Sequence, residues 1–63
     1  MAVTSPRPPL DLAGAAAYLG ITPRHLRELQ YRGELAYVKV GRLVRFRPAD
    51  LDRYLDERTV EAT

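Results

Sequence analysis

Apolar residues recur at intervals of three and four near the start of the chain, and this spacing predicts a helix over residues 12–19. The apolar positions are Leu12, Ala15, Ala16 and Leu19. Asp11 is suited to cap the first turn, and Gly20 is suited to end the helix in a left-handed conformation. The small alanines would let a second helix approach closely.

The same start and stop signals repeat at once and predict a second helix over residues 23–32. Thr22 is a hydroxyl N-cap, and it is followed by a proline at the first helical position, where a missing N–H does no harm. Leu26 and Leu29 form the apolar face, and Gly33 ends the helix. Two short helices joined by so brief a connection are typical of a helix-turn-helix.

Polarity then alternates with a period of two over residues 35–47, which predicts two short strands. The dipeptide Gly41-Arg42 lies between them, so we expect a hairpin with a two-residue turn. The residues expected to face the core are Val38, Val40, Val44 and Phe46. The residues expected to share the outer face are Lys39, Arg45 and Arg47.

A third helix is predicted from Pro48, with Asp50 in its first turn. Its buried stripe is expected to be Leu51, Tyr54 and Leu55. The expected core of the whole chain is Leu12, Leu19, Leu26, Leu29, Leu35, Val40, Phe46, Leu51 and Leu55. These elements predict an α+β fold, a small winged helix-turn-helix over residues 11–57, between an extended N-terminal tail, 1–10, and a C-terminal tail, 58–63.

The net charge of +2 hides a strong division along the chain. Residues 24–47 carry seven cations and two anions, a local charge of +5, whereas residues 48–63 carry two cations and five anions, a local charge of −3. Nine of the ten cations are arginine, whose planar fork suits phosphates and base edges. A segregated basic segment favours a polyanion as partner, although an ordinary solvated face explains the charge equally well.

The inventory of reactive side chains argues against an enzyme. The chain of 63 residues has no cysteine, one histidine and one serine, which excludes a disulfide framework, a four-ligand zinc site and a cysteine nucleophile. We read the acidic side chains of the third helix as a solvated face with no pocket to shift their pKa values. No cofactor, small-molecule substrate or membrane span is expected, and the expected location is the cytoplasm of a bacterial cell, on the nucleoid when bound to DNA.

Candidate contacts to double-stranded DNA follow from the helix-turn-helix arrangement, whose second helix presents its N-terminal half to base edges. On this helix they are Thr22, Arg24, His25, Arg27 and Gln30. On the wing and towards phosphates they are Arg32, Lys39, Arg42, Arg45 and Arg47. Each could instead be a solvated surface group. Thr22 could also serve only as a helix cap, Arg32 could interact favourably with the helix dipole, and Arg47 could form a salt bridge with Asp50.

Five short motifs together are characteristic of a known family: Ala15-Ala16-Ala17-Tyr18-Leu19-Gly20-Ile21-Thr22, Arg32-Gly33-Glu34-Leu35, Val38-Lys39-Val40-Gly41-Arg42, Val44-Arg45-Phe46-Arg47 and Asp50-Leu51-Asp52. Through them the chain resembles the excisionase-type DNA-binding domains, also called recombination directionality factors, a winged helix-turn-helix group related to the MerR-type regulators. The family usually has Glu, Thr and Pro where this chain has Gly14, His25 and Ala36.

The resemblance implies an accessory protein of a phage or integrated element. Such a protein binds repeated sites beside an attachment site, bends the DNA and directs a tyrosine integrase towards excision. It also implies cooperative self-association on DNA, for which the acidic end of one copy could meet the basic segment of the next. Two alternatives remain open: a stand-alone transcriptional regulator with the same domain, and a protein-interaction module for an acidic partner.

Overall fold

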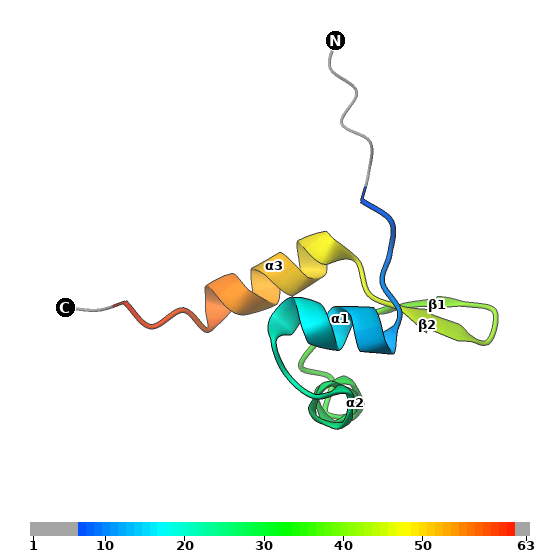
Figure 1. Ribbon diagram of the computed structural model, residues 1–63, viewed down its shortest axis with the longest axis horizontal. Coiled ribbons are helices and arrows are strands. Elements are labelled where there is room, and N and C mark those ends of the chain that lie inside the picture. Colours follow the sequence, from blue (N-terminus) through cyan, green and yellow to red (C-terminus); the bar gives the residue numbers. More distant parts are fainter. Residues whose placement is uncertain (1–6, 62–63) are drawn as a thin grey trace, which may run out of the picture.

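The computed structural model describes residues 7–61 and contains three helices and one antiparallel hairpin within that range. Helices α1 and α3 lie side by side, α2 crosses beneath α1, and the hairpin projects from the end of the molecule opposite the C-terminus (Figure 1). This is the arrangement of a winged helix-turn-helix, so the predicted α+β fold is confirmed.

The predicted limits of α1, Leu12–Leu19, are confirmed, and both of its ends have the expected caps. Gly14 N–H donates to the Asp11 carboxylate at 2.8 Å. Gly20 has a φ of 73°, and its N–H and that of Ile21 donate to carbonyls of the last turn. The helix therefore stops sharply, and the chain turns into α2.

Helix α2, Pro23–Tyr31, ends one residue before the predicted limit, because Arg32 is its C-terminal cap. The Thr22 hydroxyl accepts a hydrogen bond from His25 N–H at 3.1 Å, so the predicted N-cap is confirmed. Leu26 and Leu29 are buried against the rest of the domain. Burial of this one apolar face leaves the opposite face of α2 to the solvent.

The predicted faces of the hairpin are partly wrong, although its position and two-residue turn are confirmed and Val44 and Phe46 face the core as expected. Strand β1, Val38–Val40, pairs with β2, Leu43–Arg45, in a register that places Val38 opposite Arg45 and Lys39 opposite Val44. Opposite residues of an antiparallel pair share a face. The third pair is Val40 with Leu43.

It follows that one face carries Val38, Val40, Leu43 and Arg45, whereas the other carries Lys39 and Val44. Val40 and Leu43 are 57% and 53% exposed, so the expected burial of Val40 is also corrected. Lys39 and Arg45 do not share an outer face as expected. A period of two fixes alternation along each strand, but only the pairing across the turn decides which residues of the two strands share a side.

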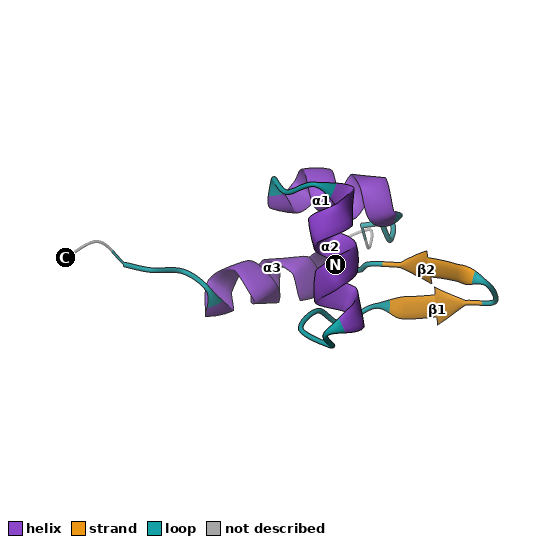
Figure 2. Cartoon of the chain, turned by 90° about the horizontal axis from the view of Figure 1, so that it is seen from below, coloured by secondary structure: helices purple, strands orange, loops and turns teal. Residues whose placement is uncertain are grey.

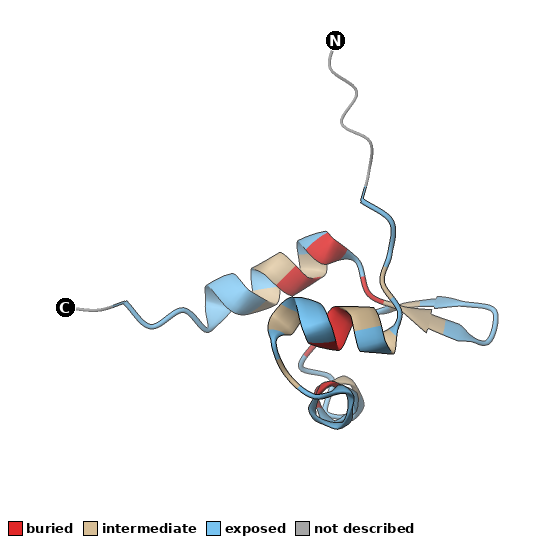
Figure 3. Cartoon of the chain, in the orientation of Figure 1, coloured by how far each residue is buried: buried red, intermediate tan, exposed pale blue. Residues whose placement is uncertain are grey.

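The core gathers residues from every helix and from the chain on both sides of the hairpin (Figure 3). Its buried members are Ala15, Ala16, Leu26, Leu29, Leu35, Phe46 and Leu51. Leu12 and Leu19, expected in the core, are half-buried and pack against it. Leu55, also expected there, is 41% exposed in the last turn of α3, so its expected burial is wrong.

Leu10 joins the end of the predicted N-terminal tail to the hairpin. Its N–H and carbonyl exchange hydrogen bonds of 2.8 Å with the carbonyl and N–H of Phe46. Residues 1–6 of that tail and the last two of the C-terminal tail lie outside the described residues. The backbone bridge holds Phe46 where its ring closes the core and contacts Tyr37 at a centroid distance of 6.4 Å.

On helix α3, Pro48–Glu57, the expected solvated acidic face is confirmed for the exposed Asp56 and Glu57 but is wrong for Asp50 and Asp52, which are paired. The Asp50 side chain is only 9% exposed and pairs with Arg47 at 3.1 Å and with Arg53 at 4.0 Å. Asp52 pairs with Arg7 at 2.9 Å and accepts a hydrogen bond from Tyr18. The Tyr18 hydrogen bond, together with that from Arg7, lowers the pKa of Asp52.

Candidate nucleic-acid interface

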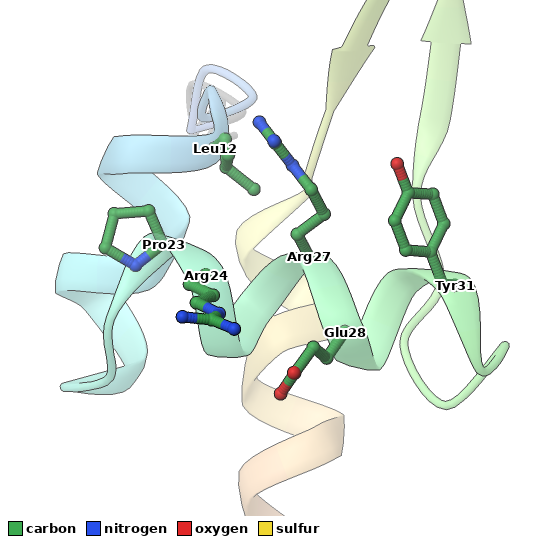
Figure 4. A pocket seen from close by; sticks show the side chains of 6 residues that line it. All are labelled: Leu12, Pro23, Arg24, Arg27, Glu28 and Tyr31. Atoms are coloured by element: carbon green, nitrogen blue, oxygen red, sulfur yellow. The ribbon is translucent and has the colours of Figure 1, made fainter.

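The solvent face of α2 carries a regular stripe of large side chains. Arg24, Arg27, Glu28 and Tyr31 follow one another at helical spacing, and all four are exposed, Tyr31 to 79%. In Figure 4, Arg27 and Tyr31 project from one side of the helix, and Arg24 and Glu28 project from the adjacent side. The stripe is the part of α2 that a partner would meet first.

An open hollow of about 540 Å³ lies along this stripe (Figure 4). Leu12 from the start of α1 and Pro23 from the start of α2 line it together with the four stripe residues. The surface that lines the hollow is mostly apolar, and Arg24 and Arg27 add two positive charges to it. The hollow combines apolar and cationic surface on one exposed helix face.

The predicted contact residues of α2 do not all lie on the stripe. Arg24 and Arg27 do, and His25 is exposed next to them. Gln30 is half-buried on the side of the helix that carries Leu26 and Leu29. The Thr22 hydroxyl is engaged as the helix cap. The structure therefore brings together the two arginines and turns Gln30 partly towards the core.

The hairpin presents cations at its tip and on both faces. Arg42 occupies the two-residue turn together with Gly41, whose φ is 62°, and its side chain is exposed. Lys39 is exposed on one face. Arg45, on the other face, is half-buried, and its guanidinium donates to the Val44 carbonyl at 2.9 Å. The hairpin stands clear of the helices in Figure 2, so its tip is free to reach a partner.

The arginines and the lysine of the chain fall into two groups by their ionic contacts. Within residues 7–61, salt bridges engage Arg7, Arg32, Arg47, Arg53 and Arg58. In that same range, no salt bridge is made by Arg24, Arg27, Lys39, Arg42 or Arg45. Every member of this second group, the free cations, lies on α2 or on the hairpin. Their charge is thus available to an external anion.

Two of the predicted phosphate contacts belong to the paired group. Arg32 lies 3.6 Å from Glu34, and Arg47 lies 3.1 Å from Asp50, the alternative that the sequence left open. Both guanidinium groups remain largely exposed, so the pairs are of the weak surface kind. An incoming phosphate would have to compete with a carboxylate at these two positions.

Glu28 and Tyr31 line the hollow beside the two arginines, although the sequence analysis did not select them as candidate contacts. The signal was present in the spacing, because residues 24, 27, 28 and 31 occupy one helix face opposite Leu26 and Leu29. Ranking residues by positive charge alone passed over the acidic and aromatic members of that face.

A family model described as a helix-turn-helix domain matches residues 10–59, most of the chain and all five of its elements. The chain belongs to this helix-turn-helix domain family. No curated protein matches it, and no solved structure does. The family occurs in excisionase-like and related DNA-binding proteins, and a helix-turn-helix domain supports DNA as the partner.

Helix-turn-helix domains of this family are typically not enzymes. Within residues 7–61, no group of three or more side chains is arranged to hold a metal ion. The helices found in the same range are too short and too polar to cross a bilayer. The side chains that dominate the proposed interface surface of this helix-turn-helix protein are arginines, a lysine and the ring of Tyr31, which at 79% is the most exposed of three exposed tyrosines within residues 7–61.

Proposed function

We propose that this helix-turn-helix protein binds double-stranded DNA sequence-specifically, with α2 in the major groove and the hairpin as a wing on the adjoining backbone or minor groove. The observation that carries the proposal is the position of the free cations, which all lie on these two elements. Cations already paired with a carboxylate on the protein surface contribute less to binding a polyanion, because a phosphate must compete with that carboxylate.

The proposed roles divide between base edges and phosphates. Arg24 and Arg27 on the stripe read bases, since an arginine fork matches the O6 and N7 acceptors of guanine in the major groove. His25 and the exposed part of Gln30 contribute beside them. Lys39, Arg42 and Arg45 contact the backbone and fix the register of the protein on the duplex, with Arg32, Arg47 and the N-terminus of α2 at Thr22 as further phosphate contacts.

Within this general function we propose the role of an excisionase. The protein would bind repeated sites beside an attachment site, bend the DNA and direct a tyrosine integrase towards excision. The motifs of the hairpin and of the helix-turn-helix, which resemble excisionase-type domains, support this role. The alternative of a transcriptional regulator uses the same residues and the same interface.

Cooperative binding of adjacent copies is part of the proposal. The hairpin and the C-terminal end of α3 lie at opposite ends of the molecule (Figure 1). The exposed acids Asp56 and Glu57 lie at the second of these ends. A head-to-tail row on DNA would therefore bring an acidic end towards a basic hairpin, and such contacts favour opposite charges.

The test is nuclease footprinting on the attachment region of the host element, followed by an excision assay with its integrase. We expect periodic protected sites and integrase-dependent excision that requires the protein. The double variant Arg24→Gln/Arg27→Gln should lose both, whereas Arg53→Gln, which changes a cation on α3, should keep both. Protection of a promoter with no effect on excision would favour the regulator, and absence of any specific footprint on element DNA would refute the proposal.

A further inference from the structure

Glu28 is an acidic side chain on the surface proposed to meet DNA. It lies on the stripe of α2, four residues after Arg24 and three before Tyr31, and lines the same hollow (Figure 4). A carboxylate facing the phosphate backbone is repelled, so its presence on this face opposes binding that depends on charge alone. Either Glu28 is neutralised inside the protein, or it has a partner in the groove.

Neutralisation inside the protein does not occur within the described residues. Glu28 has cations one helical turn away on each side, Arg24 and Arg32, yet residues 7–61 contain no salt bridge to its carboxylate. The Arg32 guanidinium instead lies 3.6 Å from Glu34. The second acid of the basic segment, Glu34, is thus engaged by Arg32 and Arg58, and Glu28 is not.

Three other acids make no salt bridge within residues 7–61, and none of them is on α2: Asp11, Asp56 and Glu61. The Asp11 carboxylate is engaged as the N-cap of α1, where it accepts a hydrogen bond from Gly14 N–H, and Asp56 and Glu61 lie towards the C-terminal end of the chain. Glu28 is the single acidic residue of α2. An unpaired carboxylate therefore occurs once on the face proposed for the major groove, between two arginines.

The chemistry of the groove then limits what Glu28 can bind. A carboxylate only accepts hydrogen bonds, and the donors on the major-groove edge are the amino groups of cytosine N4 and adenine N6. Adenine offers its amino group beside the N7 acceptor, which an amide side chain matches and a carboxylate does not. Cytosine offers the donor alone, and its partner guanine offers the acceptors that arginine prefers.

We propose that Glu28 is a specificity-determining residue that accepts a hydrogen bond from the N4 amino group of a cytosine. It acts beside an arginine of the same stripe that reads guanine. This inference rests on the proposed insertion of α2 into the major groove. Glu28 rejects other bases at its position because they leave its charge unpaired, and it weakens binding to non-specific DNA by repelling phosphate.

The test is selection of bound sequences from a randomised DNA duplex library by the wild type, Glu28→Gln, Glu28→Ala and a control, Glu61→Gln. The control removes one negative charge away from the stripe. We expect the wild type to select cytosine at one position by about tenfold, the scale of a good base contact. Glu28→Gln should shift that position towards adenine, and Glu28→Ala should select no base there. Both variants should bind unselected duplex more tightly than the wild type does, and Glu61→Gln should keep the cytosine.

Two results would overturn the inference and differ in what else they affect. If both Glu28 variants select the wild-type sequence and merely bind all duplexes more tightly by one factor, Glu28 acts through charge alone, and the proposed function stands. If the wild type enriches no sequence at all, the proposed function fails together with the inference.

Discussion

The Tyr18 hydroxyl donates a hydrogen bond of 2.5 Å to the Asp52 carboxylate and so connects α1 to α3. Arg7 donates to both groups, at 3.0 Å to the tyrosine oxygen and at 2.9 Å to Asp52. Three segments that are distant in sequence meet in this exposed cluster. The cluster holds Arg7, before α1, against the two helices. Leu10, three residues further along the chain, is hydrogen-bonded to Phe46 at the end of the hairpin.

The cluster predicts a specific pH dependence of stability. The pKa of Asp52 in the folded protein lies below its ordinary value, first because of the Tyr18 hydrogen bond and second because of the Arg7 hydrogen bond. A depressed folded pKa adds stability above the unfolded value, near pH 4, and this contribution is lost as the pH falls through the folded pKa.

Asp52→Asn should therefore lower the melting temperature at pH 7 and cost progressively less below pH 4. Thermal unfolding followed by circular dichroism across this range measures the difference. The control is Asp56→Asn, an exposed position on the same helix without a salt bridge in residues 7–61. A deficit of Asp52→Asn that is equal at pH 7 and at the acidic limit would contradict the assignment.

The corrected faces of the hairpin predict unequal effects of two identical substitutions. Val44 packs against the core, whereas Val40 is mostly exposed. Val44→Ala should lower the free energy of unfolding by about 1 kcal/mol, the cost of one or two lost buried methyl groups. Val40→Ala should change it by less than about 0.5 kcal/mol. Denaturant unfolding of both variants checks this, and equal losses would restore the original assignment, in which both valines face the core.

The turn between α1 and α2 depends on the positive φ of Gly20. An added methyl group would have open space around it, so the cost of Gly20→Ala is conformational. We expect a loss of about 1 kcal/mol from the left-handed backbone, and a smaller loss for Gly20→Asn, because asparagine tolerates this region. Chemical unfolding of the two variants measures both values. Equal losses would show that something other than φ sets the requirement for glycine.

The division between base and phosphate contacts predicts two different kinds of binding defect. Arg24→Ala should cost about 1–3 kcal/mol on the best sequence and relax the preference at one base pair. Arg45→Ala should weaken binding to all sequences alike. Competition titrations with matched and altered duplexes distinguish the two kinds of defect. Uniform weakening by Arg24→Ala would show that Arg24 contacts the DNA backbone and not a base.

The sequence predicted the helices well because their signals are local. Asp11, Thr22 and Pro48 mark where helices begin, and Gly20 marks a stop whose positive φ the structure confirms. Each signal depends on a few neighbouring residues and needs no knowledge of the fold. The same reason explains why the turn at Gly41 was placed correctly.

The sequence failed where the outcome depends on contacts between distant segments. The hairpin faces failed for another reason, because alternation along each strand was not combined with the pairing of Val40 and Leu43 that a two-residue turn imposes. The pairing of Arg7 with Asp52 spans 45 positions and has no local signature. For the candidate interface, charge identified the arginines, but Glu28 and Tyr31 were missed because they are not cationic, although their helical spacing places them on the same face.

The central claim is that the free cations of α2 and the hairpin bind duplex DNA, and the salt dependence of affinity tests it most directly. The wild type should lose affinity steeply as salt rises, because each phosphate contact releases counterions. Arg42→Gln should make the slope of log affinity against log salt shallower by about one, and Arg53→Gln should leave it unchanged. A wild-type affinity that hardly responds to salt, or equal flattening by both variants, would contradict the claim.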